Sequence, residues 1–561
     1  MCLQGTGVSG GIGIGRVVVL DNDTPDVTRK AASLDETARF NAAVRQLSAA
    51  LMEKAGNVRG AQAEILESHV MLLGDPIMQS EILGMIVGLD CNSEYASHEI
   101  LEKYAAVFEM SGDELMTARA SDLRDIKNNL IRTLCGEDIL DVSELPEGTV
   151  LVARELTASV LAGVDPEKVC ALITREGGKT SHMAIIARSL GLPAVVGISE
   201  QVMAKGSEVI VNGDTGEVIR EPSAEVLSGY NDQLEKLIRR KQELERFRGL
   251  SSQTVDGETI HLFANIGLEA DIQKARLSDA EGVGLFRTEF LYMNRSAAPT
   301  EEEQFLVYKK AAEAFNLNPV IIRTLDVGGD KDVPYLDLEK EENPFLGWRA
   351  IRYCLDRTEL FSTQLRAILR ASAFGNVKIM LPMVTNTAEF HKAKELIEQI
   401  KSELLKKNIT FNKEIAVGIM VETPAAAIMA DRFAEIADFF SIGTNDLTQY
   451  IMAADRGNLN VAPLCSTYDP AVLRLIYNVA RAAKTHGIPC GICGEAGADP
   501  MLTRFFIGVG VDELSMVGTS VLQVREIVRG ACYVDVKDKI EKELFSLRSA
   551  EEAACFLSGL S

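Results

Sequence analysis

The pattern of apolar and polar positions changes its period twice along the chain. Between about residues 35 and 135, apolar side chains recur at intervals of three and four, as at Leu66, Val70 and Leu73. This spacing is typical of amphipathic helices. Helix-breaking residues interrupt it near positions 56, 74–76 and 112. The pattern predicts an all-helical region of four or more helices.

Short β-branched runs lie on both sides of this helical region. They cover residues 16–20, 149–153, 169–174 and 208–212. The simplest arrangement is one β/α domain made of residues 1–22 and 145–222, into which residues 23–144 are inserted as a helical subdomain. Such insertions are tolerated because the termini of a compact module lie close together.

A charged segment follows the second half of the β/α domain. Residues 224–248 alternate charges over an apolar stripe that includes Leu227, Leu234 and Ile238. A stripe of this kind on a highly charged background predicts one long exposed helix. We expect residues 223–250 to form a linker helix.

The last part of the chain, residues 251–561, alternates strand-like runs with helical stretches. Eight runs are found, at 260–267, 282–289, 319–326, 377–384, 415–423, 439–446, 489–495 and 513–517. Eight β/α units over about 300 residues predict a (β/α)8 barrel. An open doubly wound sheet is the alternative, and the count of eight favours the barrel. The fold class is therefore multidomain α/β.

Composition and charge narrow the function. The net charge of −23 argues against a nucleic-acid binder, which needs a basic face, and is compatible with a basic protein partner. No apolar run reaches the roughly 18–20 residues of a membrane span, and the N-terminal residues do not resemble a signal peptide. We expect a cytoplasmic protein without membrane insertion.

Ten cysteines are scattered along the chain without a framework spacing, as expected for reduced thiols. Cys490 and Cys493 form a CxxC sequence within a predicted strand. Residues three apart on a strand point to opposite faces. A redox or zinc pair is therefore not expected.

Charged and polar residues follow the predicted barrel strands where active sites of such barrels lie. The set is Arg287, Arg323, Glu422, Asn445, Asp446 and Arg456. Guanidinium groups bind phosphate or carboxylate in a bidentate manner, and two carboxylates suit a hard cation, most plausibly Mg²⁺. A surface ion pair is the ordinary explanation for any one of these residues, but six at successive strand ends predict a site for a small phosphorylated anion.

Two further residues are candidates for chemistry. Cys493 ends the seventh predicted strand, where a thiol could be a nucleophile, an acid or a small apolar filler. His182 follows a glycine-containing turn and begins a predicted helix. Free backbone N–H groups and the helix dipole favour a phosphate at such a position. His182 is therefore the candidate phosphorylated residue.

Six motifs in this order resemble enzyme I of the phosphoenolpyruvate:sugar phosphotransferase system. They are GGKTSHMAIIARSLGLPAVVG, GLFRTEFLYM, RTLDVGGDK, FSIGTNDLTQY, DRGN and GICGE. The resemblance extends from Gly5 to about Arg529. It implies that the chain transfers the phosphoryl group of phosphoenolpyruvate to a histidine and then to HPr, a small histidine phosphocarrier, with release of pyruvate.

The resemblance also implies a role for each candidate residue. His182 would be the phosphorylated histidine and Cys493 the proton donor to the pyruvate enolate. Substrate would be bound by Arg287, Arg323, Asn445, Asp446 and Arg456. Glu422 and Asp446 would hold Mg²⁺. The helical subdomain would dock HPr, and the barrel would form a homodimer.

Several positions depart from the usual pattern of the family. They are Lys179 and the segments 464–468 and 495–499. Phosphoenolpyruvate synthase and pyruvate, phosphate dikinase share the histidine domain and barrel, but they need an ATP-binding domain for which the sequence before His182 has no room. The paralogous nitrogen-regulatory enzyme I is a closer alternative. It carries an extra N-terminal sensor domain, which we do not expect in this sequence. A non-catalytic scaffold that binds phosphoenolpyruvate is the alternative from another class.

Overall fold

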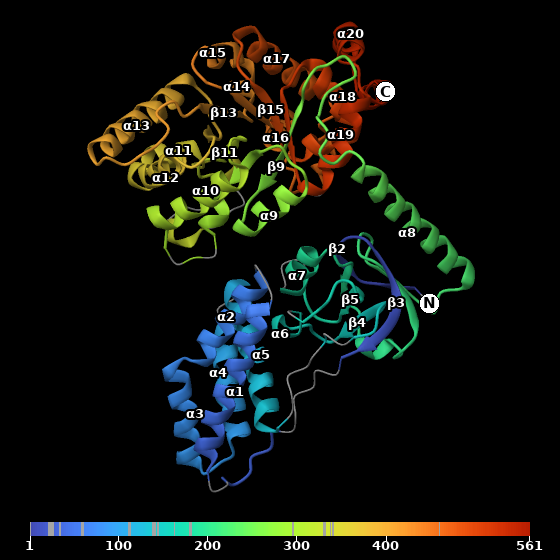
Figure 1. Ribbon diagram of the computed structural model, residues 1–561, viewed down its shortest axis with the longest axis vertical. Helices are drawn as coiled ribbons and strands as arrows, with labels where there is room; N and C mark the ends of the chain where they lie inside the picture. The colour runs from blue at the N-terminus through green and yellow to red at the C-terminus, as the bar shows by residue number, and fades with distance from the viewer. Residues whose placement is uncertain are drawn as a thin grey trace. The chain divides into compact units, whose positions relative to one another are not determined.

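The computed structural model describes residues 2–20, 27–32, 35–57, 61–109, 114–136, 142, 145–161, 163–178, 182–293, 295, 297–328, 333–336, 338, 341–458 and 460–560. The chain divides into two compact units, Met1–Arg239 and Arg240–Ser561. Figure 1 shows the elements of both units along the chain.

An eight-stranded sheet forms the centre of the first unit, in the order β1-β8-β7-β3-β4-β5-β6-β2. Strands β3 to β6 run parallel, whereas the remaining strands pair antiparallel. The strands are β1 (Cys2–Gln4), β2 (Thr6–Ser9), β3 (Ile12–Val19), β4 (Thr149–Ala153), β5 (Val169–Thr174), β6 (Ala194–Val196), β7 (Glu208–Asn212) and β8 (Glu217–Arg220). Helices α6 (Ala158–Leu161) and α7 (His182–Leu190) connect the parallel strands, and their apolar side chains share one buried core with the sheet.

Five helices occupy the chain between β3 and β4. They are α1 (Glu36–Asn57), α2 (Ala61–Leu73), α3 (Pro76–Leu89), α4 (Ser93–Glu109) and α5 (Glu114–Leu134). Helix α3 begins at Pro76 because the side chain of Asp75 accepts hydrogen bonds from the free N–H groups of Ile77 and Met78. The helices have a core of their own, separate from the cores of the sheet. The predicted helical insertion into a β/α domain is confirmed.

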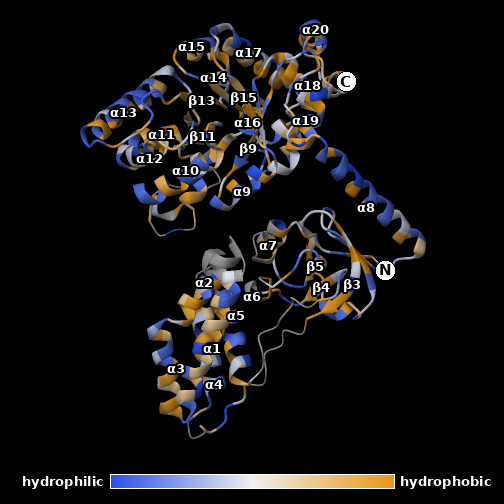
Figure 2. Cartoon of the chain, in the orientation of Figure 1, coloured by the Kyte–Doolittle hydropathy of each residue, from blue (hydrophilic) through white to orange (hydrophobic). Residues whose placement is uncertain are grey.

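Helix α8 (Ala224–Glu245) is the predicted linker helix. None of its residues is buried, and Figure 2 shows that most of its length is hydrophilic. Its solubility and helicity therefore depend on its charged surface rather than on a packed face.

A closed barrel of eight parallel strands forms the second unit, with β9 to β16 in sequence order and β16 paired with β9. The strands are β9 (His261–Ile266), β10 (Val283–Arg287), β11 (Val320–Arg323), β12 (Val377–Leu381), β13 (Val417–Val421), β14 (Phe440–Gly443), β15 (Cys490–Cys493) and β16 (Glu513–Met516). The predicted (β/α)8 barrel is confirmed, and the alternative of an open sheet is wrong.

Helices surround the barrel and share its large outer core. They are α9 (Glu269–Leu277), α10 (Glu301–Phe315), α11 (Ile351–Asp356), α12 (Thr358–Ala371), α13 (Thr387–Lys406), α14 (Pro424–Ile428), α15 (Ala430–Ala434), α16 (Thr444–Met452), α17 (Pro470–His486), α18 (Pro500–Val509), α19 (Val521–Gly530), α20 (Tyr533–Glu543) and α21 (Ala550–Ser558). A smaller cluster fills the inside of the barrel and contains Leu285, Ile321, Met380, Met420, Phe439 and Cys493. This packed interior positions the strand ends rigidly.

Among the described residues, no single helix has the length and apolar character needed to cross a bilayer. Helices α2 and α3 reach that criterion only when taken together, and a 50° bend separates them.

Candidate active site

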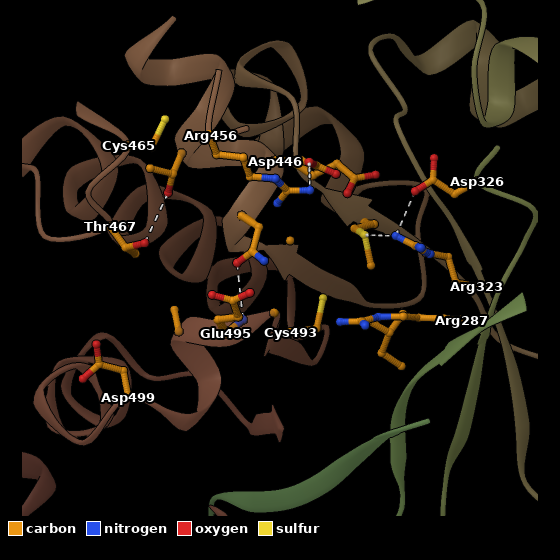
Figure 3. A pocket seen from close by; sticks show the side chains of 18 of the residues that line it. Arg287, Arg323, Asp326, Asp446, Arg456, Cys465, Thr467, Cys493, Glu495 and Asp499 are labelled. Atoms are coloured by element: carbon orange, nitrogen blue, oxygen red, sulfur yellow. Dashed lines mark hydrogen bonds and ion pairs between the residues drawn. The ribbon is translucent and has the colours of Figure 1, made fainter. Parts of the chain in front are cut away.

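A pocket of about 700 Å³ opens at the C-terminal ends of the barrel strands. Figure 3 shows side chains from several strands and loops pointing into it. The structure brings together in its wall all seven residues that sequence analysis assigned to the barrel, namely Arg287, Arg323, Glu422, Asn445, Asp446, Arg456 and Cys493. They are adjacent because the parallel strands end on the same face of the barrel.

Arg323 is the most enclosed of the predicted arginines, with 6% of its surface exposed. Its Nη2 lies 2.7 Å from Glu289 Oε1, and its Nη1 lies 3.1 Å from Asp326 Oδ2. Burial opposes the charge, but the neighbouring carboxylates outweigh it and raise the pKa of Arg323. The guanidinium is therefore a permanent, fixed positive charge at the pocket.

Arg456 and Asn445 extend the polar wall on the other side. Arg456 Nη2 lies 3.3 Å from Asp446 Oδ1, and 39% of the arginine side chain is exposed. The Asn445 side-chain oxygen accepts a hydrogen bond from the backbone N–H of Glu495 at 3.3 Å. Asp446 therefore holds Arg456 in place while part of the guanidinium side chain remains exposed at the opening of the pocket. This arrangement suits an anion that arrives from solvent.

Glu422 and Asp446 place two carboxylates in the same pocket. Glu422 is 1% exposed, and its Oε1 accepts a hydrogen bond of 2.6 Å from the backbone N–H of Met383. Burial, followed by the nearby charge of Asp446, raises the pKa of Glu422 to about 8. Because Asp446 disfavours the charge of Glu422, a cation bound at the two carboxylates would relieve the repulsion.

Cys493 lies at the floor of the pocket with 1% of its surface exposed. Its thiol donates a hydrogen bond of 3.5 Å to the carbonyl of Ile442. Burial raises the pKa of Cys493 to about 12, so the group is a protonated thiol at neutral pH. This state favours an acid over a nucleophile. Cys490 lies in the outer core instead, on the other face of β15.

Three family models match consecutive parts of the chain. A PEP-utilising enzyme, N-terminal model matches residues 4–119, a mobile-domain model matches 145–216, and a PEP-binding-domain model matches 241–533. A phosphoenolpyruvate-protein phosphotransferase of Bacillus sp. (strain S) is 43% identical, over 99% of this chain and 97% of that protein. This level and extent of identity decide the family.

The chain belongs to the phosphoenolpyruvate-protein phosphotransferase family. Proteins of that name from Bacillus subtilis (strain 168) and Haemophilus influenzae (strain ATCC 51907 / DSM 11121 / KW20 / Rd) are each 40% identical to it. The first alignment covers 99% of both chains, and the second covers 98% of this chain and 97% of the relative. Enzymes of this family use a divalent metal ion.

One carboxylate oxygen of the pocket bears on the fit of such a metal ion. Asp446 Oδ1 is buried and accepts no hydrogen bond from the described residues, and its ion-pair partner Arg456 Nη2 lies 3.3 Å away. Among those residues, no group of three or more His, Cys, Asp or Glu side chains could hold a metal ion by itself. The two carboxylates therefore fit a hard cation that takes its remaining oxygen ligands from substrate and water, as Mg²⁺ commonly does.

His182 belongs to the other compact unit. Helix α7 begins at His182, as the sequence predicts. The side chain of His182 and the residue Lys179 lie outside what the structure describes. The role of His182 in this phosphotransferase family therefore stays a prediction.

Asp326 and Arg349 are two charged residues of the pocket that were not assigned from the sequence. Asp326 follows β11, and its position at a strand end was the signal that could have identified it. Arg349 comes from the connection between β11 and α11, so no rule about strand ends would find it. Both are nearly inaccessible to solvent, at 1% and 2% exposure, and they add a further buried charge pair to the site.

Proposed function

We propose that this chain transfers the phosphoryl group of phosphoenolpyruvate to His182 and then to the phosphocarrier HPr, with release of pyruvate. The reaction would be the first step of a sugar-uptake phosphorelay. The observation that carries the proposal is the pocket of the barrel, where arginines, two carboxylates and a buried thiol meet. Membership of the phosphotransferase family supports it.

Each part of the pocket fits a different part of that substrate. Arg287, Arg323 and Arg456 present positive charge for the phosphate and carboxylate of phosphoenolpyruvate. Asn445 offers amide hydrogen bonds from the same wall. Cys493 remains a thiol until an enolate carbon approaches, and its proton would convert the enolate into pyruvate.

The carboxylates of Glu422 and Asp446 would hold Mg²⁺. When bound, the ion would neutralise part of the negative charge of phosphoenolpyruvate and of the transferring group. Arg323, which is fixed by Glu289 and Asp326, would orient the substrate in the pocket. Fixed positive groups need no reorganisation as the negative charge moves.

Each proposed role is assigned to one part of the fold. We assign residues 1–22 and 145–222 to a swivelling phosphohistidine domain, 23–144 to an HPr-binding subdomain, 223–250 to the linker and 251–561 to phosphoenolpyruvate binding. Four apolar side chains on α2 and α3 are exposed, namely Met71, Ile77, Val87 and Leu89. They support a protein-docking role for the helical subdomain. Exposed Leu346, Ile428 and Leu464 support a homodimer through the barrel.

A phosphorylation assay tests the proposal. Incubation with phosphoenolpyruvate and Mg²⁺ should produce one acid-labile phosphate on the chain and an equivalent amount of pyruvate. His182→Ala should abolish both, whereas His391→Ala, on the surface helix α13, should leave them unchanged. Phosphate that remains after His182→Ala would show that another residue is the acceptor. Phosphoenolpyruvate binding without transfer would favour the scaffold, and failure of HPr to accept the phosphate would remove only the partner from the proposal.

A further inference from the structure

Arg349 is held in the pocket wall by groups from three parts of the barrel, and the third of them has no role in the function proposed above. The first is the carboxylate of Asp326, after β11, and the second is that of Asp446, in the first turn of α16. The third is the hydroxyl of Tyr450, which accepts a hydrogen bond of 3.5 Å from Arg349 Nη1. Residues four apart on a helix share a face, so one face of α16 presents both Asp446 and Tyr450 to the guanidinium.

The Tyr450 hydroxyl is engaged on both sides. It donates its hydrogen to the carbonyl of Phe345, in the short helical turn Pro344–Leu346, and its oxygen accepts from Arg349 Nη1. A hydroxyl has one hydrogen to donate, and an arginine can only donate, so the two bonds are compatible. The Phe345 ring lies on the same side, with its centre 5.9 Å from Arg349 Cζ. Tyr450 therefore ties α16 to the connection that carries Arg349.

The N–H groups of Arg349 divide between these partners. Its Nε lies 3.3 Å from Asp326 Oδ1, and its Nη2 contacts the carboxylates of both Asp326 and Asp446. Among the described residues, Nη1 donates to Tyr450 alone. Because Nη1 carries two hydrogens, the second is left for a ligand in the pocket, whose wall Arg349 lines.

A neutral partner suits this nitrogen. Asp326 and Asp446 already offset the charge of the guanidinium, and a third carboxylate would cancel more of the attraction for a substrate anion. A phenol, whose ordinary pKa is about 10, adds no negative charge at neutral pH. Tyr450 therefore restrains Nη1 while the pocket keeps its attraction for anions.

We propose that Tyr450 is a positioning residue for phosphoenolpyruvate, which holds Arg349 Nη1 so that its second hydrogen meets an anionic oxygen of the substrate. This inference rests on the proposed function. Tyr450 itself does not line the pocket, so its effect on the substrate passes through Arg349. The hydrogen bond from Nη1 to an anion would exist both in the bound substrate and during transfer, so its loss weakens binding more than it slows the chemical step.

Single-turnover labelling tests this role without a phosphocarrier. The full chain is mixed rapidly with Mg²⁺ and phosphoenolpyruvate at a series of concentrations, and acid-labile phosphate on the chain is followed with time. The data give a maximal labelling rate and a half-saturating concentration of phosphoenolpyruvate. For Tyr450→Phe, we expect the half-saturating concentration to rise by about tenfold and the maximal rate to change by less than about twofold.

A double-mutant cycle shows whether Tyr450 acts through Arg349. Arg349→Lys removes Nη1, so adding Tyr450→Phe to this variant should change the half-saturating concentration by less than about twofold. The same rise in both backgrounds would show that the hydroxyl acts independently of the guanidinium, and would overturn the inference. If Arg349→Lys is labelled too slowly to measure, Tyr450→Phe decides alone, and an unchanged half-saturating concentration overturns the inference.

Tyr477→Phe is the matched control. The Tyr477 hydroxyl also accepts a hydrogen bond from an arginine, Arg481 Nη1 at 3.1 Å, but the residue lies outside the active-site pocket. Its half-saturating concentration should equal that of the unaltered protein. A lower Tm in Tyr450→Phe with unchanged labelling would assign the hydroxyl to stability alone and leave the phosphotransfer intact. Absence of labelling in the unaltered protein would instead overturn the proposed function, and this inference with it.

Discussion

Arg349 and Asp326 face each other at the wall of the pocket, with Arg349 Nη2 2.8 Å from Oδ1 and 3.1 Å from Oδ2 of Asp326. The same Nη2 lies 3.6 Å from Asp446 Oδ2. Burial opposes the charge, but Asp326 and Asp446 outweigh it and raise the pKa of Arg349. The guanidinium therefore connects two carboxylates, one of which is a proposed metal ligand.

Replacement of Arg349 by lysine should impair substrate use more than it impairs folding. Lysine keeps the charge but loses the planar fork that spans the two carboxylates. We expect kcat/KM for phosphoenolpyruvate to fall by about 100-fold, as measured by pyruvate release. Arg352→Lys is the matched control, since Arg352 donates to the carbonyls of Leu346 and Gly347 outside the pocket. Equal activity of the two variants would contradict a functional role for Arg349.

Tyr468 and Asp499 join the two segments that depart from the usual family pattern. The Tyr468 hydroxyl donates a hydrogen bond of 2.6 Å to Asp499 Oδ2, and both residues line the pocket. Asp499 Oδ1 also accepts from Met501 N–H at the start of α18. The bond therefore ties the segment after Arg456 to the segment after Cys493.

Tyr468→Phe should loosen this connection. Because the ring is kept and only the hydroxyl is lost, we expect a rise of about fivefold in KM for phosphoenolpyruvate, corresponding to about 1 kcal/mol, with little change in Tm. Tyr533→Phe removes a hydroxyl that pairs with Lys484, outside the active-site pocket, and serves as the control. A large loss of Tm in Tyr468→Phe without a change in KM would assign the bond to stability alone.

The carboxylates of Glu422 and Asp446 should control the affinity of the pocket for a metal ion. Glu422→Gln and Asp446→Asn keep the size of each side chain but remove one of the negative charges that a cation would neutralise. We expect each to weaken Mn²⁺ binding, used as a spectroscopic substitute for Mg²⁺, by about 10–100-fold. Glu495→Gln, another acidic residue of the pocket wall, should bind Mn²⁺ normally. Unchanged binding in both carboxylate variants would place the metal elsewhere.

The sequence predicts the barrel and most of its pocket for a single physical reason. Strands of a parallel barrel are buried on both faces, so they appear as apolar runs, and polar residues that follow them share one end of the barrel. Arg323, Glu422 and Cys493 could be identified in this way. Arg349 could not, because its place depends on the path of a connection between β11 and α11, which has no periodic pattern.

Buried polar residues inside elements are also hard to identify from sequence. Glu513 begins a strand and reads as a solvent-facing acid, because the space for its carboxyl depends on glycines in two other strands. The helical subdomain shows the same limit. The spacing around Leu66 and Leu73 predicts its helices, but it does not reveal that His69 meets acidic side chains of a helix about fifty residues later.

His69 of α2 lies between two aspartates of α5 and is fully buried. Its Nε2 is 3.1 Å from Asp122 Oδ1, and its Nδ1 is 3.8 Å from Asp125 Oδ2. Burial disfavours the imidazolium, but the hydrogen bond to Asp122 and the charge of Asp125 outweigh it and raise the pKa of His69. In its protonated form, the histidine would pair with both aspartates and hold α2 and α5 together.

The stability of the helical subdomain should consequently depend on pH. Since the pKa of His69 is higher in the folded state, its contribution is fully present below the unfolded value of about 6.5 and is lost as pH rises through the folded value. Denaturant unfolding followed by helical circular dichroism between pH 5.5 and 8.5 should show this loss, and His69→Gln should reduce it.

His98 provides a control of opposite sign, because burial and Lys127 lower its pKa. His98→Gln should remove a contribution that grows with pH, so that the decline of stability toward pH 8.5 becomes steeper. A pH profile that His69→Gln leaves unchanged would show that the imidazole is neutral in the folded protein.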